Sequence, residues 1–276
     1  AADEKTNESL FYRGSAYGNL ARYQALRGEF VKAFLNAKKA KRAHETVLEK
    51  DKNYFDAYVS IGAYNYYAAS LPKWIEVLAG LLGLGGDRPT GILQLERACS
   101  GGGVGAIEAK FFLANVYYEE GRYETSLAYY QELAAQFPHN PYLVNQVGLV
   151  LFGMEKFSCA EAAFQSALQL SNDQTLPAKM FTLFFLGRVA KLKSDYSAAM
   201  DYFRQAIMIS EKRHAVKDPE AWITGAAYFQ IGECMDLSGR AKEAAEFYQK
   251  VKTQRMSQPI IQSATTRLRS PLSDFE

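Results

Sequence analysis

The sequence predicts an all-α protein, an α-solenoid of about six helix-turn-helix units. Three observations lead to this prediction. Small, apolar and aromatic residues recur with a period of about 34 residues, which is typical of helical repeats. Within each period, apolar residues recur at steps of three and four, which is the periodicity of a helix. Segments that alternate apolar and polar residues between hairpin turns, as β-strands do, do not stand out.

Four consecutive units carry the repeat most completely, near residues 107–140, 141–174, 180–213 and 225–258. The eighth residue of each unit is Gly or Ala and the twentieth is small, which predicts that the two helices of a unit cross closely there. The twenty-fourth residue is aromatic, and we expect its ring to fill the gap between neighbouring units. These aromatic residues are Tyr130, Phe164, Phe203 and Tyr248.

Two further units precede these four, near residues 14–50 and 55–100, with a poorer fit to the repeat. In the first of them, Ala37 stands where the later units have an aromatic residue, and the second helix is expected to run on to about Glu49. In the other, an insert at residues 70–88 separates the two helices. Asp87 follows the glycines of this insert and is placed to cap the next helix, with Pro89 in its first turn.

The insert is apolar on nearly every side of a short predicted helix, so it does not have the composition of a solvated loop. One interpretation is that it folds back and packs on the array. The other is that it forms a hydrophobic contact for a partner or a membrane surface. The residues that would make this contact are Trp74, Ile75, Leu78, Leu81 and Leu82.

The two ends of the chain differ in character. Residues 1–13 begin with a polar stretch, and we expect a flexible N-terminal segment there. Residues 259–276 place Ile260, Ile261, Leu268 and Leu272 between polar residues, which predicts a C-terminal segment that caps the last unit. The start at Ala1-Ala2 fits cleavage of an export signal as well as a trimmed chain end, and it favours an exported, periplasmic protein over a cytoplasmic one.

The composition argues against several classes of function. The formal net charge is +2, from 32 basic and 30 acidic residues, so the chain lacks the strongly basic field of a nucleic-acid binder. A local basic run, Lys38, Lys39, Lys41 and Arg42, is interpreted as a solvated outer face or as a contact for phosphate or acidic lipid.

Residues that could carry catalysis or hold a metal are scattered. Cys99, Cys159 and Cys234 are far apart and are expected to be small buried hydrophobes. His44, His139 and His214 stand alone in different units, and we interpret them as solvated or capping residues. None of the spacings that mark nucleophilic, phosphate-binding or zinc sites occurs. The sequence therefore predicts no enzyme activity, no cofactor and no metal.

The repeat resembles that of the tetratricopeptide repeat family, whose units are helix-turn-helix pairs in a right-handed superhelix. This resemblance implies that the first helices of the units line a concave groove, with positions 2, 5, 9 and 12 of each unit facing into it. It also implies a protein partner and no catalysis. The candidate groove residues are Tyr66, Phe111, Asn115, Tyr118, Tyr142, Asn145, Phe152, Phe181, Phe184, Arg188 and Phe229.

One subclass of that family captures the C-terminal carboxylates of chaperones through Lys at position 5 and Asn at position 9. Here Phe111 precedes Asn115 where that subclass has Lys, so a chaperone-tail clamp is not expected. Residues 71–98 also resemble a stretch of the tetratricopeptide repeat protein 39 family, through Leu71-Pro72, Gly86-Asp87-Arg88 and the helix from Gly91 to Leu95. That second resemblance implies architecture and not function.

The sequence thus favours a non-enzymatic scaffold that binds a segment of a partner protein in an aromatic groove. One alternative is a structural subunit of a membrane-associated complex, docked through the apolar insert. The other is a carrier of a small ligand or lipid.

Overall fold

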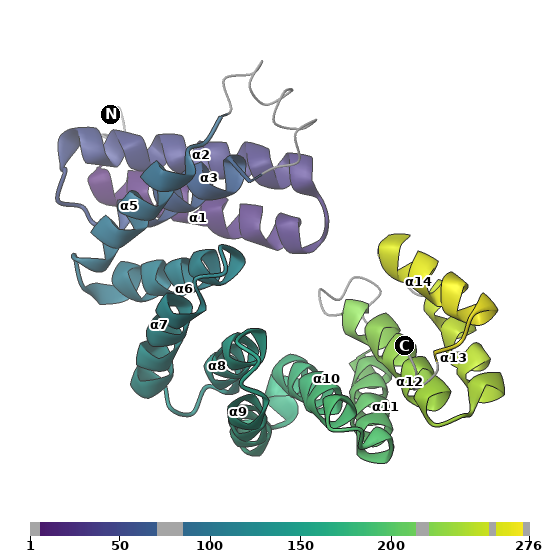
Figure 1. Cartoon of the computed structure of the whole chain (residues 1–276). Helices are drawn as coiled ribbons and strands as arrows, with labels where there is room; N and C mark the ends of the chain where they lie inside the picture. Colours follow the sequence, from purple (N-terminus) through teal and green to yellow (C-terminus); the bar gives the residue numbers. More distant parts are fainter. Residues whose placement is uncertain (1–5, 71–84, 214–220, 254–257, 273–276) are drawn as a thin grey trace. The chain divides into compact units, whose positions relative to one another are not determined.

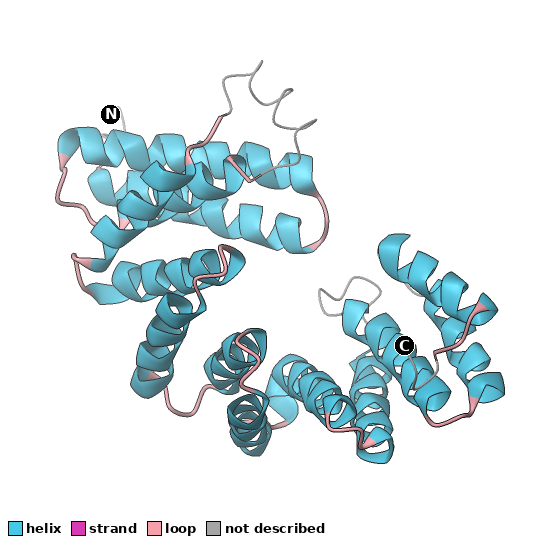
Figure 2. Cartoon of the chain, viewed as in Figure 1, coloured by secondary structure: helices cyan, strands magenta, loops and turns pink. Residues whose placement is uncertain are grey.

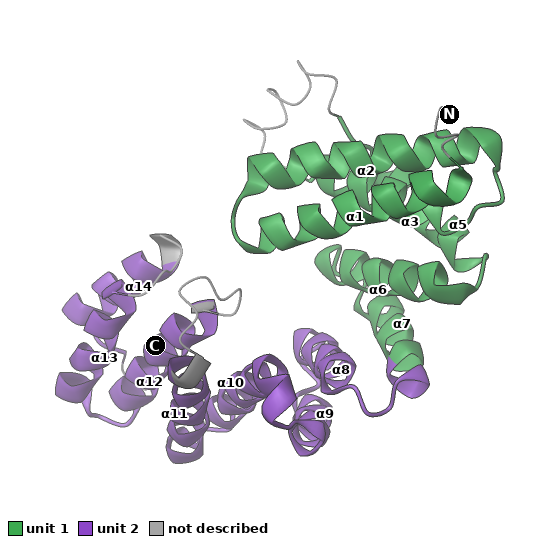
Figure 3. Ribbon diagram, turned by 180° about the vertical axis from the view of Figure 1, so that it is seen from behind, with its two compact units in different colours: residues 1–133 green, residues 134–276 purple. Residues whose placement is uncertain are grey.

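The computed structural model describes residues 6–70, 85–213, 221–253 and 258–272. All the regular secondary structure in these ranges is helical, which confirms the predicted fold class (Figures 1 and 2). The chain divides into two compact units, residues 1–133 and residues 134–276 (Figure 3). Among the described helices, none is long and apolar enough to cross a membrane.

Unit 1 is built from helical pairs. Helices α1 (Asn7–Leu26) and α2 (Phe30–Lys50) form the first pair, and α3 (Ala57–Ala68) packs against α5 (Arg88–Cys99) in the second. Helix α6 (Gly103–Glu119) contacts α7 (Tyr123–Gln136), in which the boundary between the units falls. The hydroxyl of Ser126 in α7 donates a hydrogen bond to the backbone oxygen of Ala114 in α6, at 2.7 Å.

Unit 2 repeats the same arrangement. Helix α8 (Pro141–Gly153) pairs with α9 (Phe157–Leu170), and α10 (Leu176–Leu192) pairs with α11 (Tyr196–Arg213) after a short 3-10 turn, η1 (Asp173–Thr175). Helix α12 (Ala221–Leu237) pairs with α13 (Ala241–Thr253), and α14 (Gln258–Arg269) packs against α13. One apolar core runs through these pairs, from Ala160 and Phe164 to Val251 and Ala264.

The first helix begins earlier than the sequence indicated. Thr6 caps α1 by accepting a hydrogen bond from the backbone nitrogen of Ser9, and Leu10 is only 3% exposed. Residues 7–13 are therefore helical and packed, where a flexible N-terminal segment was expected. The reason is that Leu10 packs with Val47 and Ala57 of later helices, a contact that the polar composition of the first residues does not reveal.

The recurring spacing of small and aromatic residues has a direct structural cause within each pair of unit 2. A Cβ atom on Gly187 would lie 2.6 Å from the ring of Phe203, and one on Gly232 would lie 2.6 Å from the ring of Tyr248. Gly148 and Phe164 repeat this contact. The glycine at position 8 is thus required by the aromatic ring at position 24 of the same pair.

The second pair of unit 1 uses its glycines differently. A Cβ on Gly62 would lie 2.8 Å from the backbone oxygen of Gly91, so here the two helix backbones themselves cross closely, as the sequence predicted. Asp87 caps α5 by accepting a hydrogen bond from the backbone nitrogen of Thr90 at 2.8 Å, and Pro89 lies in the first turn, which confirms both expectations.

Two expectations about reactive residues are wrong. His44 is buried, with 1% of its surface exposed, because it packs between Gly14 and the ring of Phe11 in the α1–α2 pair. Cys159 is exposed, whereas Cys234 is buried as expected. Burial raises the pKa of the Cys234 thiol to about 11, so this thiol stays protonated at neutral pH.

Candidate functional site

The first helices of the pairs in unit 2 are α8, α10 and α12, and they carry seven of the candidate groove residues. Five of them are at least partly exposed, and we call their side of these helices the A-helix face of unit 2. The A-helix face of unit 2 comprises Tyr142, Phe152, Phe181, Arg188 and Phe229.

Three of these residues form one aromatic and cationic cluster. Phe185 of α10 is its centre, with ring centroids 5.6 Å from Phe152 of α8 and 4.6 Å from Phe181. The guanidinium of Arg188 lies over both rings, 4.5 Å from the centroid of Phe152 and 5.4 Å from that of Phe185. Such a geometry holds an arginine flat against aromatic rings while part of its surface stays accessible.

The other two members lie at the two ends of this face. Tyr142 is the second residue of α8, and 47% of its surface is exposed. Phe229 of α12 is half-buried, with its ring 5.7 Å from that of Tyr248 in the same pair. Between α10 and α12, the ammonium of Lys191 forms an ion pair with Glu233 and donates a hydrogen bond to Gln230 at 3.0 Å.

Asn145 and Phe184 were predicted to face the groove, but their side chains lie in the interior of unit 2. The Asn145 amide nitrogen donates to the backbone oxygen of Ala178 at 3.0 Å, and the Thr182 hydroxyl donates to the Asn145 amide oxygen at 2.8 Å. Phe184 is 4% exposed and packs edge-on against Trp222 at 5.6 Å. Asn145 thus links α8 to α10, and Phe184 packs α10 against α12.

The four candidate groove residues of unit 1 also make most of their contacts with other residues of the unit. Tyr66 is 2% exposed and belongs to the core. The Asn115 amide donates to the backbone oxygen of Phe111, one turn earlier in α6, at 2.7 Å. Phe111 and Tyr118 are half-buried, and the ring of Tyr118 packs against Tyr123 at 5.5 Å. The insert residues Trp74, Ile75, Leu78, Leu81 and Leu82 lie outside the described residues.

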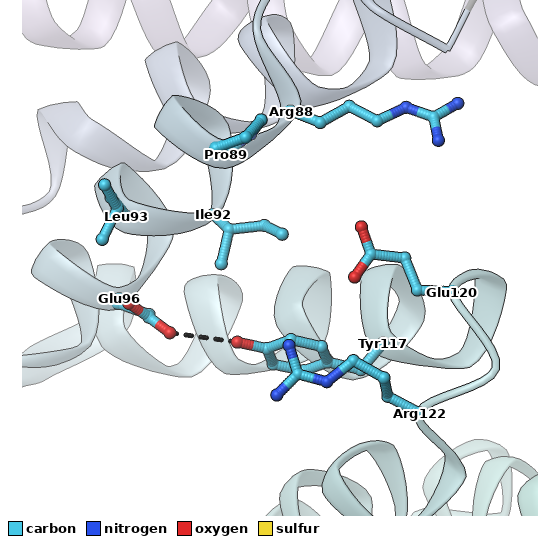
Figure 4. A pocket seen from close by; sticks show the side chains of 8 residues that line it. All are labelled: Arg88, Pro89, Ile92, Leu93, Glu96, Tyr117, Glu120 and Arg122. Atoms are coloured by element: carbon cyan, nitrogen blue, oxygen red, sulfur yellow. Dashed lines mark hydrogen bonds between the residues drawn. The ribbon is translucent and has the colours of Figure 1, made fainter.

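Unit 1 also has a cavity of about 600 Å³, which the sequence did not predict (Figure 4). Its lining comes from α5, from the end of α6 and from the turn that follows. The lining residues are Arg88, Pro89, Ile92, Leu93, Glu96, Tyr117, Glu120 and Arg122. The only sequence signal close to it is the Gly86-Asp87-Arg88 motif, which could not indicate the α6 side of the cavity.

Charged and aromatic side chains meet in the lining of this cavity. The Tyr117 hydroxyl donates a hydrogen bond to Glu96 at 3.0 Å (Figure 4), and burial together with this bond raises the pKa of Tyr117 to about 12. The guanidinium of Arg122 stacks on the Tyr117 ring, 4.2 Å from its centroid. A tyrosine with a raised pKa stays protonated at neutral pH and is a poor general base. The lining residues include no Ser, Thr or Cys that could act as a nucleophile. Within the described ranges, no cluster of metal-ligating side chains was found.

Comparisons with solved structures agree with the fold. The chain is similar to pilF of Pseudomonas aeruginosa, with 15% identity, 93% of this chain and 98% of that chain covered, and a TM-score of 0.58. It is similar to yeast Tom70, with 13% identity, 98% and 57% covered, and a TM-score of 0.58. A structure of the APC/C hetero-tetramer Cut9–Hcn1 matches with 17% identity, 95% and 48% covered, and a TM-score of 0.58. At these identities the likeness shows the fold alone.

Sequence comparison with curated proteins gives a partial match. The chain is 26% identical over 115 residues to the cell division cycle protein 16 homologs of mouse and human. The match takes in 40% of this chain and spans only 17% of the length of those relatives.

Family models add a match that is specific to the repeat. Models described as tetratricopeptide repeat match residues 101–141, 182–213 and 226–255. The first match takes in α6 and α7, the second begins within α10 and ends with α11, and the third takes in most of α12 together with α13. Three segments of the chain therefore match tetratricopeptide repeats, within an all-helical repeat fold.

Proposed function

We propose that this protein is a non-enzymatic scaffold that binds a segment of a partner protein on the A-helix face of unit 2. The observation that carries the proposal is the cluster of Arg188, Phe152 and Phe181 around Phe185. Aromatic residues and arginine are enriched where protein interfaces gain most of their binding energy. An arginine already ordered by two rings loses little side-chain entropy when a partner arrives.

The chemistry of this face suggests what the partner segment carries. Its accessible surface is aromatic, so apolar side chains of the partner would be buried there, each full burial contributing about 1.5–3 kcal/mol. Arg188 would pair with a carboxylate or with backbone oxygens of the partner. An amphipathic helix or an extended segment with at least one acidic residue fits both requirements.

The test uses the full chain and two matched double variants. Tyr142→Ala/Arg188→Ala removes one exposed aromatic ring and one arginine from the A-helix face of unit 2. Met208→Ala/Arg204→Ala removes one large apolar residue and one arginine from α11, where Met208 is 54% exposed. Proteins captured from native extract by the wild type and by each variant are quantified side by side, and the main captured protein is then purified and titrated.

We expect the first double variant to weaken binding by about tenfold or more, and the control to leave it within about twofold. Thermal unfolding of both variants shows whether the fold is intact. Equal affinity of the wild type and the Tyr142→Ala/Arg188→Ala variant for the captured partner would refute the proposed face.

The alternative hypotheses remain predictions. Docking through the apolar insert depends on residues outside the described ranges. A carrier of an apolar ligand is not favoured by the cavity in unit 1, because Arg88, Glu96, Glu120 and Arg122 give it a charged lining. The likeness of residues 71–98 to the tetratricopeptide repeat protein 39 family also stays a prediction about architecture.

A further inference from the structure

The turn between α1 and α2 exposes large apolar side chains. Leu26, Phe30 and Val31 are 60%, 61% and 76% exposed, and they lie within six consecutive residues around this turn. Tyr23 and Leu35, one helical turn further along α1 and α2, are 54% and 50% exposed. We call these five residues the hairpin tip.

The hairpin tip is not an ordinary feature of the repeat. The first residue of the second helix is aromatic in three later pairs as well, but Tyr123, Phe157 and Tyr196 are half-buried where Phe30 is exposed. The residue that follows it is polar and exposed in the four pairs from α6–α7 to α12–α13 and is Val31 here. Those four polar residues are Glu124, Ser158, Ser197 and Lys242. Val31 thus offers an apolar group to water where those pairs offer a polar one, and Phe30 is exposed where three of them have a half-buried aromatic residue.

The packing of the pair does not require the hairpin tip. None of the buried residues of α1 and α2 belongs to the hairpin tip. The buried residues are Leu10, Gly14 and Ala21 of α1 and Ala33, Ala40, Ala43, His44 and Val47 of α2. We expect replacement of Phe30 or Val31 by a polar residue to leave this core in place, because both side chains are largely exposed.

Positive charge is concentrated on the same pair. Residues 7–50 contain nine Lys and Arg against four Asp and Glu, a net charge of +5, whereas the whole chain has +2. The single acidic residue of the turn, Glu29, lies 3.2 Å from Arg27 and 3.0 Å from Lys32, so its charge is neutralised locally. Of the basic run noted in the sequence, Lys41 is turned inward and donates to Asn65 at 2.9 Å.

The rest of that basic run continues the hairpin tip along α2. Val31, Leu35, Lys38 and Arg42 follow one another at steps of four, three and four residues, which places them in one stripe on the outer side of the helix. Apolar residues stand at the end of the stripe next to the turn, and cations stand behind them. This order is that of a segment whose tip enters the apolar layer of a membrane while its cations meet the headgroups.

The shape of the hairpin tip favours a bilayer over a protein partner. Its residues protrude from the turn between two helices, whereas the residues that dominate protein interfaces fill well-packed pockets. A fluid bilayer takes up a protruding apolar group without a preformed hollow. We propose that the α1–α2 hairpin binds the surface of an anionic phospholipid membrane, with Leu26, Phe30 and Val31 in the boundary between headgroups and acyl chains. This contact goes beyond the proposed binding of a partner protein and does not depend on it.

The test measures sedimentation of the full chain with vesicles of phosphatidylcholine alone and of phosphatidylcholine mixed with phosphatidylglycerol. The variant Phe30→Ser/Val31→Ser alters the hairpin tip. The control Leu93→Ser/Val104→Ser alters two residues of the same unit that are equally exposed, at 64% and 77%. The variant Lys38→Gln/Arg42→Gln removes two cations and no apolar surface.

We expect the wild type to bind the vesicles that contain phosphatidylglycerol at least about tenfold more tightly than those without it, and to be released by salt. The Phe30→Ser/Val31→Ser variant should bind them about tenfold more weakly, and the control within about twofold of the wild type. The Lys38→Gln/Arg42→Gln variant should lose several-fold in affinity. In a Phe30→Trp variant, the tryptophan emission that exceeds that of the wild type should shift to the blue when these vesicles are added, because the new ring enters an apolar layer.

Two results would overturn the proposal. One is the absence of binding to vesicles that contain phosphatidylglycerol, which would leave the hairpin tip to a protein partner. The other is equal binding of the Phe30→Ser/Val31→Ser variant and its control, which would place the membrane contact elsewhere in the chain. Unchanged circular dichroism and unfolding temperature of the variants separate both results from misfolding.

Discussion

The side chain of His44 makes the stability of the first helical pair depend on pH. Its Nε2 donates a hydrogen bond to the backbone oxygen of Phe11 at 3.0 Å, its ring stacks on the Phe11 ring at 5.0 Å, and its Nδ1 has no hydrogen-bond partner. Burial lowers the pKa of His44 from its usual value of 6.5, and the bond to Phe11 only partly opposes this shift. The neutral imidazole is therefore the form that the folded state accommodates.

The pH dependence of stability follows from the direction of this shift. In the unfolded chain His44 takes up a proton as the pH falls through 6.5, whereas the folded chain resists protonation until a lower pH. The contribution to the free energy of unfolding is thus fully present above pH 6.5 and is lost below it, by at most about 1.4 kcal/mol per pH unit. Urea unfolding between about pH 7.5 and pH 5.5 should show this slope, and His44→Gln should flatten it.

His139 provides the control, since it is exposed in the turn before α8. His139→Gln should leave the slope as it is in the wild type. An identical slope for the wild type and His44→Gln would show that His44 titrates normally in the folded chain.

At the scale of helices, the contact between glycine and an aromatic ring sets how closely the two helices of a pair approach. The sequence indicated that the two helices of a unit cross closely at position 8, without showing which atoms meet there. The structure shows that in unit 2 the ring at position 24 lies against the glycine, whereas at the Gly62–Gly91 crossing in unit 1 backbone lies against backbone. A ring that covers a glycine also reaches the next pair, as the 5.4 Å stacking of Phe164 on Phe185 shows.

Gly187→Ala should therefore destabilise the chain. The added methyl group would overlap the Phe203 ring, and overpacking of this kind costs about 1–3 kcal/mol, more than the gain of at most about 1 kcal/mol from better helix propensity. Gly18→Ala in α1 is the matched control, because its methyl group would meet Ser60 Oγ at 3.4 Å and Ala40 Cβ at 3.9 Å, both ordinary contacts. Thermal unfolding should show a lower midpoint for Gly187→Ala and an equal or higher one for Gly18→Ala. A loss of similar size in both would point to helix bending rather than to the ring.

Helix α14 covers the end of the core of unit 2. Ala264 is fully buried, and the backbone nitrogen of Leu272 donates to the Asp236 carboxylate at 3.1 Å, which also accepts the Tyr248 hydroxyl at 2.7 Å. This arrangement supports the proposal that the C-terminal segment is a cap, since an array of pairs ends on an apolar face that water would otherwise contact.

Ala264→Glu tests the cap, because it would place a carboxylate against buried apolar groups and cost about 2–3 kcal/mol. We expect faster hydrogen exchange in α13 and a lower unfolding midpoint. Gln262→Glu adds the same charge at an exposed position of the same helix and should change neither. Equal exchange in the two variants would mean that α14 contributes little to covering α13.

At the scale of the whole molecule, each compact unit has its own core. Leu113 is fully buried in unit 1 and Met180 in unit 2. Contacts in a repeat protein are mostly between neighbouring elements. We therefore expect the two units to differ in local stability and to open independently, rather than to unfold in one cooperative step.

Hydrogen exchange of two core variants should show this distribution. Leu113→Ala and Met180→Ala should each cost about 2–5 kcal/mol locally, and each should speed exchange mainly in the helices of its own unit. If either variant speeds exchange equally in α3 and in α12, the chain unfolds as one cooperative body and the expectation is wrong.

The sequence alone determined the fold class, because local features specify the helical repeat. These features are the steps of three and four residues, the recurring small and aromatic positions, and the cap at Asp87. It also indicated Phe152, Phe181 and Arg188, which the structure brings together around Phe185. Tertiary structure decided which of the predicted groove positions are accessible, which the repeat positions alone could not show. Asn145 and Phe184 turn inward, because the packing of α8, α10 and α12 sets which side of a helix meets a neighbour. The burial of His44 and the exposure of Phe30 and Val31 have the same cause: whether a side chain meets water depends on helices distant in the sequence, and no local pattern records them.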